Sequence, residues 1–294
     1  MLKQRIITAL LLLPAVYFLI FSLRLEIFVA IILIIVYLMA LEWAKLAGFS
    51  KPTHSSYFAL VVSAINLSIW YSSERVEVWP SISWPNYFHL DLPLVILLVS
   101  QLAIFVAVMI VLTFSANKRW WQAKLSKSLL GIILLPAFFI SFVSIRNIGY
   151  SAGDTIYGGM LLFYMLLIIW AADIGAYFFG KAFGKTKLTQ VSPNKTWEGA
   201  IGGLILSCTV GWFGISVLDL KVDNKVLFIT VIVSLVIISV FGDLFESALK
   251  RAAKTKDSGN LLPGHGGLLD RLDSTITVAP VFYLTFSYFE WFNG

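Results

Sequence analysis

Apolar segments long enough to cross a lipid bilayer recur along most of the chain, and they restrict its fold more than any other feature. Crossing the hydrocarbon takes about 20 residues in a helix. Nine segments approach or reach that length: 6–23, 26–42, 57–71, 93–114, 128–145, 157–180, 199–218, 226–245 and 275–292. Hydrophobic residues make up 59% of the chain and charged residues 13%, outside the range of water-soluble globular proteins. We therefore predict an all-α polytopic bundle of about nine transmembrane helices, with residues 1–294 forming one membrane domain.

The positive charges fall mainly on one side of this predicted bundle. With nine spans, 17 of the 22 Lys and Arg residues lie at the N-terminus or in the segments near 43–56, 115–127, 181–198 and 246–274. The opposite side has only five: Arg24, Arg75, Arg146, Lys221 and Lys225. Because cytoplasmic loops of membrane proteins are rich in Lys and Arg, we expect the N-terminus and these segments to face the cytoplasm. The net charge of +6 then requires no nucleic-acid partner.

Two local features exclude common alternatives. The first apolar run, 6–23, is too long for a signal peptide and lacks a small-residue cleavage site after it, so we expect it to be retained as a span. The single cysteine, Cys208, excludes an internal disulfide and a cysteine-built zinc site, and a packing role is expected for it.

Asp173 is an acidic residue near the end of the sixth predicted span. It shares a helix face with Tyr177, four residues later, about two turns inside the membrane edge. A carboxylate at that depth costs a few kcal/mol on insertion scales, so it should face a polar cavity and a partner. A structural hydrogen bond between helices is the alternative, and the sequence leaves it open.

The segment 185–199 combines cations with a predicted helix start. Ser192 is expected to cap that helix and Pro193 to occupy its first position. The free amides and positive dipole end of a helix N-terminus attract anions, and Lys195 stands one turn further on. An ordinary cytoplasmic loop with a helix cap explains the segment equally well. The glycines that follow would allow close packing of the seventh span: Gly199, Gly202 and Gly203.

Residues 242–274 form the most charged and glycine-rich stretch of the chain. The spacing of its first polar residues places them on one helix face at the end of the eighth span: Asp243, Glu246, Ser247 and Lys250. A loop with the sequence Pro-Gly-His-Gly-Gly follows at 263–267, and its glycines would let backbone amides approach a phosphate. Asp270 and Asp273, with Arg271 between them, open the last span.

Carboxylates that converge from separate spans are suited to Mg²⁺, which prefers oxygen ligands and keeps waters that substrate phosphates can replace. Nearby Lys and Arg would neutralise polyphosphate charge. His265 fits a loop hydrogen bond as well as a functional role. We find neither a Ser–His pairing typical of a nucleophilic triad nor a histidine cluster typical of zinc.

Together these motifs resemble the phosphatidate cytidylyltransferases, also called CDP-diacylglycerol synthases. The resemblance is strongest in three short sequences: Ser247-x-x-Lys250-Arg251, Lys256-Asp257-Ser258, and Pro263-Gly-His-Gly-Gly-x-x-Asp270-Arg271-x-Asp273-Ser274. The segments 192–199 and 173–177 are also similar to that family. Similarity extends along the whole chain and is weakest between about 50 and 155.

The resemblance implies an enzyme that transfers the cytidylyl group of CTP to phosphatidic acid, in a homodimer embedded in the lipid of a bacterial inner membrane with its active site facing the cytoplasm. It implies Mg²⁺, with a second cation left open, held by Asp243 and Asp270. The expected catalytic residues are Asp243, Asp270, Lys250, Arg251 and Asp273. The expected substrate-binding residues are Asp173, Ser192, Asn194, Lys195, Ser247, Lys256, Asp257, His265, Gly266, Gly267 and Arg271.

The division of labour expected along the chain places the scaffold and dimer contacts in 1–150 and catalysis in 151–294. Two other functions remain open from the residues alone. Another Mg²⁺-dependent lipid transferase would carry denser Asp-rich repeats, and it would not require CTP. A secondary transporter would place its carboxylates near the middle of the membrane, within inverted repeats that this sequence lacks. Cytosine specificity and acyl-chain preference have no signature of their own in the sequence.

Overall fold

The computed structural model describes residues 13–72, 91–114, 120–150, 153–262, 264 and 266–292. Long helices joined by short connections account for nearly all of them. The helices are α2 (Leu25–Ala47), α3 (Pro52–Ser72), α4 (Leu92–Thr113), α5 (Lys124–Asn147), α6 (Tyr157–Phe183), α7 (Trp197–Val217), α8 (Lys225–Ala252) and α9 (Leu269–Tyr288). Residues 13–21 are helical as well. The β-structure within these ranges is limited to two isolated bridges, so the prediction of an all-α fold is confirmed.

Six of the described helices are long and apolar enough to cross a membrane: α2, α4, α5, α6, α7 and α8. They indicate an integral membrane protein. The other two labelled helices, α3 and α9, have 21 and 20 residues but do not reach the same apolarity. Polar residues explain this, since α9 begins with Asp270 and Asp273 and α3 includes His54 and Asn66. The count of nine spans is therefore not confirmed.

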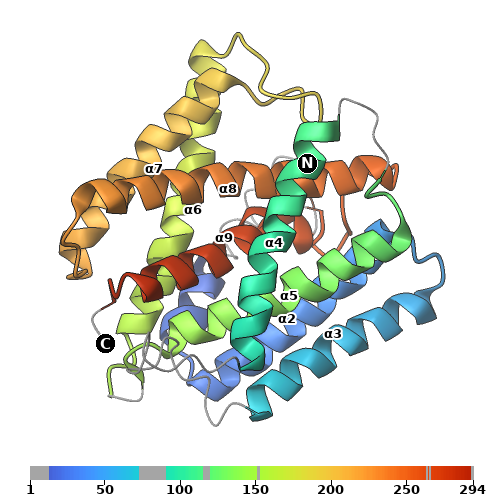
Figure 1. Ribbon diagram of the computed structural model, residues 1–294, viewed down its shortest axis with the longest axis horizontal. Coiled ribbons are helices and arrows are strands. Elements are labelled where there is room, and N and C mark those ends of the chain that lie inside the picture. The colour runs from blue at the N-terminus through green and yellow to red at the C-terminus, as the bar shows by residue number, and fades with distance from the viewer. Residues whose placement is uncertain are drawn as a thin grey trace.

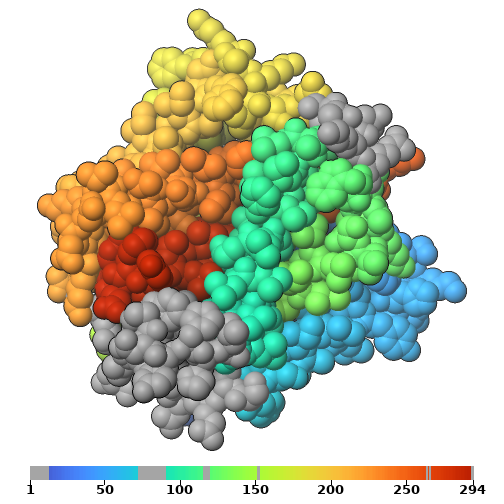
Figure 2. All heavy atoms as spheres, in the orientation of Figure 1, coloured from blue at the N-terminus to red at the C-terminus, as the bar shows by residue number. Residues whose placement is uncertain are grey.

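The helices form two unequal groups around α9 (Figure 1). On one side α2, α3 and α5 pack side by side, and on the other α6 and α7 pack along each other, with the ends next to their connection projecting from the rest. Between them α9 contacts α8, α5 and α4. Figure 2 shows α4 crossing the front of α8 and α9. The N-terminal end of α9 is thus within reach of helices from both halves of the chain.

Glycines bring the backbones of α6 and α7 into close contact. A Cβ at Gly175 would lie 2.6 Å from the carbonyl oxygen of Gly202, and one at Gly203 would lie 2.5 Å from that of Ala172. No side chain fits at such distances, so only glycine permits this packing. The predicted close packing of the seventh span is confirmed.

The start of α7 differs from the prediction. The helix begins at Trp197, and Thr196 caps it by accepting a hydrogen bond from the Gly199 amide at 3.2 Å. Ser192 and Pro193 instead lie in a turn closed by the Lys195 amide and the Ser192 carbonyl at 3.1 Å. Proline fixes φ near the value that the second position of a type I turn requires, so it suits this turn as well as a helix start. The predictions of Ser192 as the cap, Pro193 as the first helical residue and Lys195 one turn further on are wrong, because all three precede the helix.

Candidate active site

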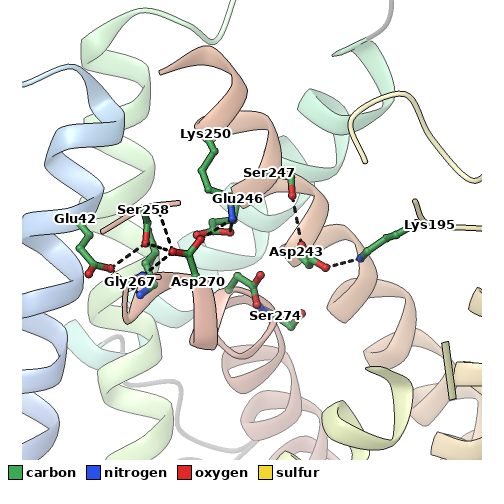
Figure 3. A network of polar contacts seen from close by, with 12 residues as sticks. Glu42, Lys195, Asp243, Glu246, Ser247, Lys250, Ser258, Gly267, Asp270 and Ser274 are labelled. Carbon is green, nitrogen blue, oxygen red and sulfur yellow. Dashed lines mark hydrogen bonds and ion pairs between the residues drawn. The ribbon is translucent and has the colours of Figure 1, made fainter. Parts of the chain in front are cut away.

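The carboxylate of Asp270, in the first turn of α9, is surrounded by hydrogen-bond donors (Figure 3). Its Oδ1 lies 2.7 Å from Nζ of Lys250 on α8. Its Oδ2 accepts from the backbone amides of Ser258 and Gly267 at 2.9 and 2.8 Å, and from the Ser258 hydroxyl at 2.9 Å. Only 5% of the Asp270 side chain is exposed. Both oxygens are therefore occupied by donors of the protein itself.

The backbone of the turn that follows α8 fits closely around the Asp270 carboxylate. The Leu262 amide donates to the Gly266 carbonyl at 2.9 Å, and Gly266 has a φ of +83°, in the left-handed region. A Cβ at position 266 would lie 2.7 Å from Oδ2 of Asp270. Both the backbone conformation and the available space therefore require glycine here. The sequence predicted that Gly266 and Gly267 lie close to a ligand, and the structure places them against Asp270.

The donors around Asp270 determine its charge. Burial by itself would raise the pKa of this carboxyl. The hydrogen bonds from Lys250, Gly267 and Ser258 outweigh burial and hold the pKa of Asp270 below its ordinary value. Asp270 is therefore ionised at neutral pH. Lys250 also pairs with Glu246, one turn earlier on α8, and so joins two carboxylates.

Asp243 forms a second, more open ion pair. Its Oδ2 lies 2.6 Å from Nζ of Lys195, and the two side chains are 30% and 28% exposed. The Ser247 hydroxyl donates to Oδ1 over 3.4 Å, so this hydrogen bond is long. Figure 3 shows this pair further along α8 from Asp270 and its loop, on the side of Lys195. The predicted polar face of α8 is thus confirmed, and its residues contribute to two centres.

Lys195 reaches Asp243 because the connection between α6 and α7 folds back on itself. The Leu188 amide donates to the Lys195 carbonyl at 2.8 Å, and the Trp197 amide donates to the Thr186 carbonyl at 3.0 Å. The Glu198 carboxylate accepts from the Thr186 amide at 3.1 Å. These contacts form a narrow hairpin that projects Lys195 toward α8.

Two further predicted carboxylates lie near this open pair. Asp273 accepts a hydrogen bond from the Ser274 amide at 2.7 Å and lies within electrostatic range of Asp243 and Lys195. Asp173 interacts electrostatically with Asp243, Lys195 and Arg271. Carboxylates from α6, α8 and α9 therefore converge with cations at one end of the bundle, as the sequence predicted.

Most of the remaining predicted residues have exposed side chains. Exposed side chains belong to Arg251, Lys256, Asp257 and Arg271, and to Asn194 in the turn before α7. Ser192, in the same turn, is half-buried. His265 and Pro263 lie outside the described residues. The structure thus gathers Asp173, Asp243, Asp270, Asp273, Lys195, Ser247, Lys250, Gly266 and Gly267, and leaves the side chains of Asn194, Arg251, Lys256, Asp257 and Arg271 exposed.

Sequence reasoning missed Glu42 and Ser258 as site residues. Glu42, on α2, is 6% exposed, and its Oε2 accepts from the Ser258 hydroxyl at 3.0 Å. The two residues are 216 positions apart in the chain. An acidic residue at the end of the apolar run 26–42 was the available signal, because carboxylates within apolar spans need a partner.

The carboxylate oxygens of the site are ligands of the kind that Mg²⁺ prefers, although in this structure they are paired with lysines. Among the described residues, no group of three or more His, Cys, Asp or Glu side chains is arranged to hold a metal ion. Asp270 has both oxygens occupied, so a metal there would have to displace Lys250 from Oδ1. Asp243 is more exposed and has fewer donors. The site therefore fits a cation better at Asp243 than at Asp270.

Comparison with known proteins agrees with this constellation. Residues 3–289 match the model of the cytidylyltransferase family. The chain is 35% identical to the phosphatidate cytidylyltransferase of Pseudomonas aeruginosa over 96% of both chains, and 34% identical to that of Haemophilus influenzae over 99% of both. It is 41% identical to that of Bacillus subtilis over 54% of this chain and 59% of the relative. With an all-helical membrane architecture and an acidic–basic site that includes the predicted motif residues, the chain belongs to the cytidylyltransferase family.

Proposed function

We propose that this enzyme transfers the cytidylyl group of CTP to phosphatidic acid, forming CDP-diacylglycerol and pyrophosphate. The observation that carries the proposal is the open Asp243–Lys195 pair beside the buried Asp270–Lys250 pair, at the ends of α8 and α9. In this arrangement the exposed Asp243–Lys195 pair is accessible to phosphates, and the charged Asp270–Lys250 pair lies fixed beside it. Membrane-spanning helices beside the site suit a lipid phosphate, and a water-accessible site suits a nucleotide.

In the proposed reaction an oxygen of the lipid phosphate attacks the α-phosphorus of CTP. The bond from that phosphorus to the oxygen that bridges it to the β-phosphorus breaks, and pyrophosphate leaves with the electron pair. Phosphoryl and nucleotidyl transfers demand positioning and charge neutralisation more than covalent help from the protein. Lys195 is 28% exposed and can turn from Asp243 to the triphosphate, and Arg271 is exposed and, like Lys195, interacts electrostatically with Asp173. Lys250 and Arg251 are proposed to contribute positive potential along the path of the leaving pyrophosphate.

Mg²⁺ is part of the proposal, with Asp243 and Asp270 as the residues that would hold it. When bound, the ion would neutralise phosphate oxygens and stabilise the charge on the leaving group. The chain's own contribution is to present Asp243 on an accessible helix face and to keep Asp270 ionised through its amide donors. Asp273 lies within electrostatic range of Asp243 and would add a further carboxylate beside it.

The proposal also includes the membrane topology. Nine spans, a cytoplasmic N-terminus and a site facing the cytoplasm of a bacterial inner membrane agree with the one-sided distribution of Lys and Arg. A cysteine introduced by Lys254→Cys in a Cys208→Ala background tests this. An impermeant maleimide should label it in inverted vesicles and not in sealed cells.

A homodimer is the proposed assembly. Purified protein in detergent should show twice the chain mass by light scattering after the contribution of bound detergent is subtracted. A monomer that retains full activity would reject the dimer and leave the reaction untouched.

One assay tests the chemical proposal directly. Purified protein is incubated with phosphatidic acid and each nucleoside triphosphate in turn, with Mg²⁺ present or chelated. CTP alone should yield both CDP-diacylglycerol and pyrophosphate, and chelation should stop turnover. Turnover with phosphatidic acid replaced by a prenyl phosphate, or substrate uptake into liposomes without conversion, would contradict the proposal.

A further inference from the structure

Glu42 is a buried acidic residue of the N-terminal half that contacts the loop holding Asp270. Three hydrogen bonds end on its carboxylate: from the Leu268 amide at 3.1 Å, the Leu269 amide at 2.8 Å and the Ser258 hydroxyl at 3.0 Å. Figure 3 shows Glu42 reaching from α2 toward Ser258 and Gly267. Glu42 contacts none of the charged side chains proposed to act on substrate phosphates, so any catalytic effect must act through the loop.

The start of α9 depends on this distant residue. The first amides of a helix lack partners within the helix and are usually capped by a neighbouring side chain. The residue before α9, Leu268, makes no side-chain cap. Glu42 takes over that role for Leu268 and Leu269, and its charge suits the positive end of the helix. Asp270 is the next residue of this turn, so the cap also sets the position of its backbone.

The loop is built closely around the Glu42 carboxylate. A Cβ at Gly259 would lie 2.3 Å from Oε1 of Glu42, and one at Gly267 would lie 2.5 Å from Oε2. Larger residues at either position would push the carboxylate away. Gly259 follows Ser258, whose amide donates to Oδ2 of Asp270, and Gly267 donates to the same oxygen through its own amide. Glu42 and Asp270 are thus enclosed by the same short loop.

Ser258 connects the two carboxylates directly. Its hydroxyl oxygen lies 3.0 Å from Oε2 of Glu42 and 2.9 Å from Oδ2 of Asp270. A serine has one hydroxyl proton, so it can donate fully to only one carboxylate at a time. A change at Glu42 therefore alters the donor available to Asp270 as well as the position of the loop.

We infer that Glu42 is a positioning residue, which holds Asp270 in place through Ser258 and the first amides of α9. The inference rests on the proposed function, in which Asp270 serves the transfer reaction. It also means that α2, from the half of the chain expected to be scaffold, completes the site.

Graded substitution of Glu42 tests this inference. Glu42→Ala removes all three hydrogen bonds, and we expect kcat to fall about 10- to 100-fold, as for other residues that orient a catalytic group, with KM for CTP little changed. Glu42→Gln can keep its oxygen at the Oε2 position and so retain the bonds from Leu269 and Ser258, with an intermediate kcat. In both variants hydrogen exchange of the 258–269 amides should be faster than in the wild-type protein.

Asp154→Ala is the matched control. Asp154 also accepts hydrogen bonds from two amides at a helix start, those of Ile156 and Tyr157 at 2.9 Å each, ahead of α6. Its loss should speed exchange near residue 156 and leave kcat unchanged. If Glu42→Ala does not fold, Glu42→Gln carries the comparison alone.

Three outcomes would overturn the inference: wild-type kcat in a folded Glu42→Ala or Glu42→Gln protein, an equal fall of kcat in Asp154→Ala, or unchanged exchange of 258–269. The exchange measurement needs no activity, so it separates this inference from the reaction. A wild-type protein that makes no CDP-diacylglycerol would reject the proposed function, whereas faster exchange in the Glu42 variants would still support the link from Glu42 to the loop.

Discussion

Asp270 and Asp243 are each paired with a lysine at similar distances, 2.7 and 2.6 Å, yet their surroundings differ. Asp270 and Lys250 are 5% and 14% exposed, whereas Asp243 and Lys195 are 30% and 28% exposed. Asp270 has three further hydrogen bonds from a loop, and Asp243 has one long one from Ser247.

This difference indicates two roles for the same pair of residue types. A buried ion pair whose carboxylate oxygens both accept hydrogen bonds from the protein cannot lose its lysine without leaving an unpaired charge. A half-exposed pair can exchange its lysine for water, a cation or a phosphate at little cost. We therefore interpret the Asp270 centre as the more fixed part of the site, where a cation would have to replace Lys250, and the Asp243 centre as the more open part.

The largest effect is expected at the fixed centre. Asp270→Ala leaves Lys250 and three loop donors without their acceptor, so it should lower the free energy of unfolding by about 3–5 kcal/mol and also abolish transfer. Denaturant unfolding in detergent, read beside activity, measures both. A stable but inactive Asp270→Ala protein would show that this centre is not structural.

At the open centre we expect loss of activity without loss of stability. Asp243→Asn should lower kcat about 10³-fold, because it removes charge where phosphates are handled, and change the unfolding midpoint very little. The protein should still insert and purify normally. Retained CDP-diacylglycerol synthesis would remove Asp243 from the reaction and erase the distinction between the centres.

Lys195 should show a smaller effect of the same kind. Lys195→Met removes one mobile cation and should reduce kcat/KM for CTP about 100-fold. Lys187→Met is the matched control, since Lys187 lies in the same hairpin with an exposed side chain, and its activity should stay near that of the wild type. Equal losses in both variants would mean that overall positive charge, not the Asp243 pair, matters.

The smallest expected effect concerns the loop around Asp270. Gly266→Ala combines a left-handed φ with crowding against Oδ2 of Asp270, whereas Gly48→Ala has a φ of +104° and nothing within 4 Å of the added methyl. Backbone strain alone costs about 1 kcal/mol. The unfolding free energy should therefore fall by about that amount in Gly48→Ala and by more in Gly266→Ala. Equal losses would show that the loop yields easily and that Asp270 is less fixed than its contacts indicate.

Local sequence pattern was sufficient for most of the helices. The predicted spans 93–114 and 157–180 correspond to α4 at Leu92–Thr113 and α6 at Tyr157–Phe183, because long apolar runs in lipid have few other conformations. The prediction failed at Ser192 because a Ser-Pro pair suits a turn as well as a helix start. The i, i+4, i+7 spacing of Asp243, Ser247 and Lys250 predicted helix beyond the apolar span 226–245, and α8 does continue to Ala252.

The sequence by itself determined the helical membrane bundle and the two stretches, 173–199 and 242–274, that contain the motif residues. Apolar length and i, i+4 spacing, on which these predictions rest, are local properties. Only the tertiary structure decided that Asp270 is enclosed and Asp243 open, and that Glu42 closes the loop around Ser258. Those contacts join residues up to 227 positions apart, and the packing of helices against one another, which no local pattern encodes, brings them together.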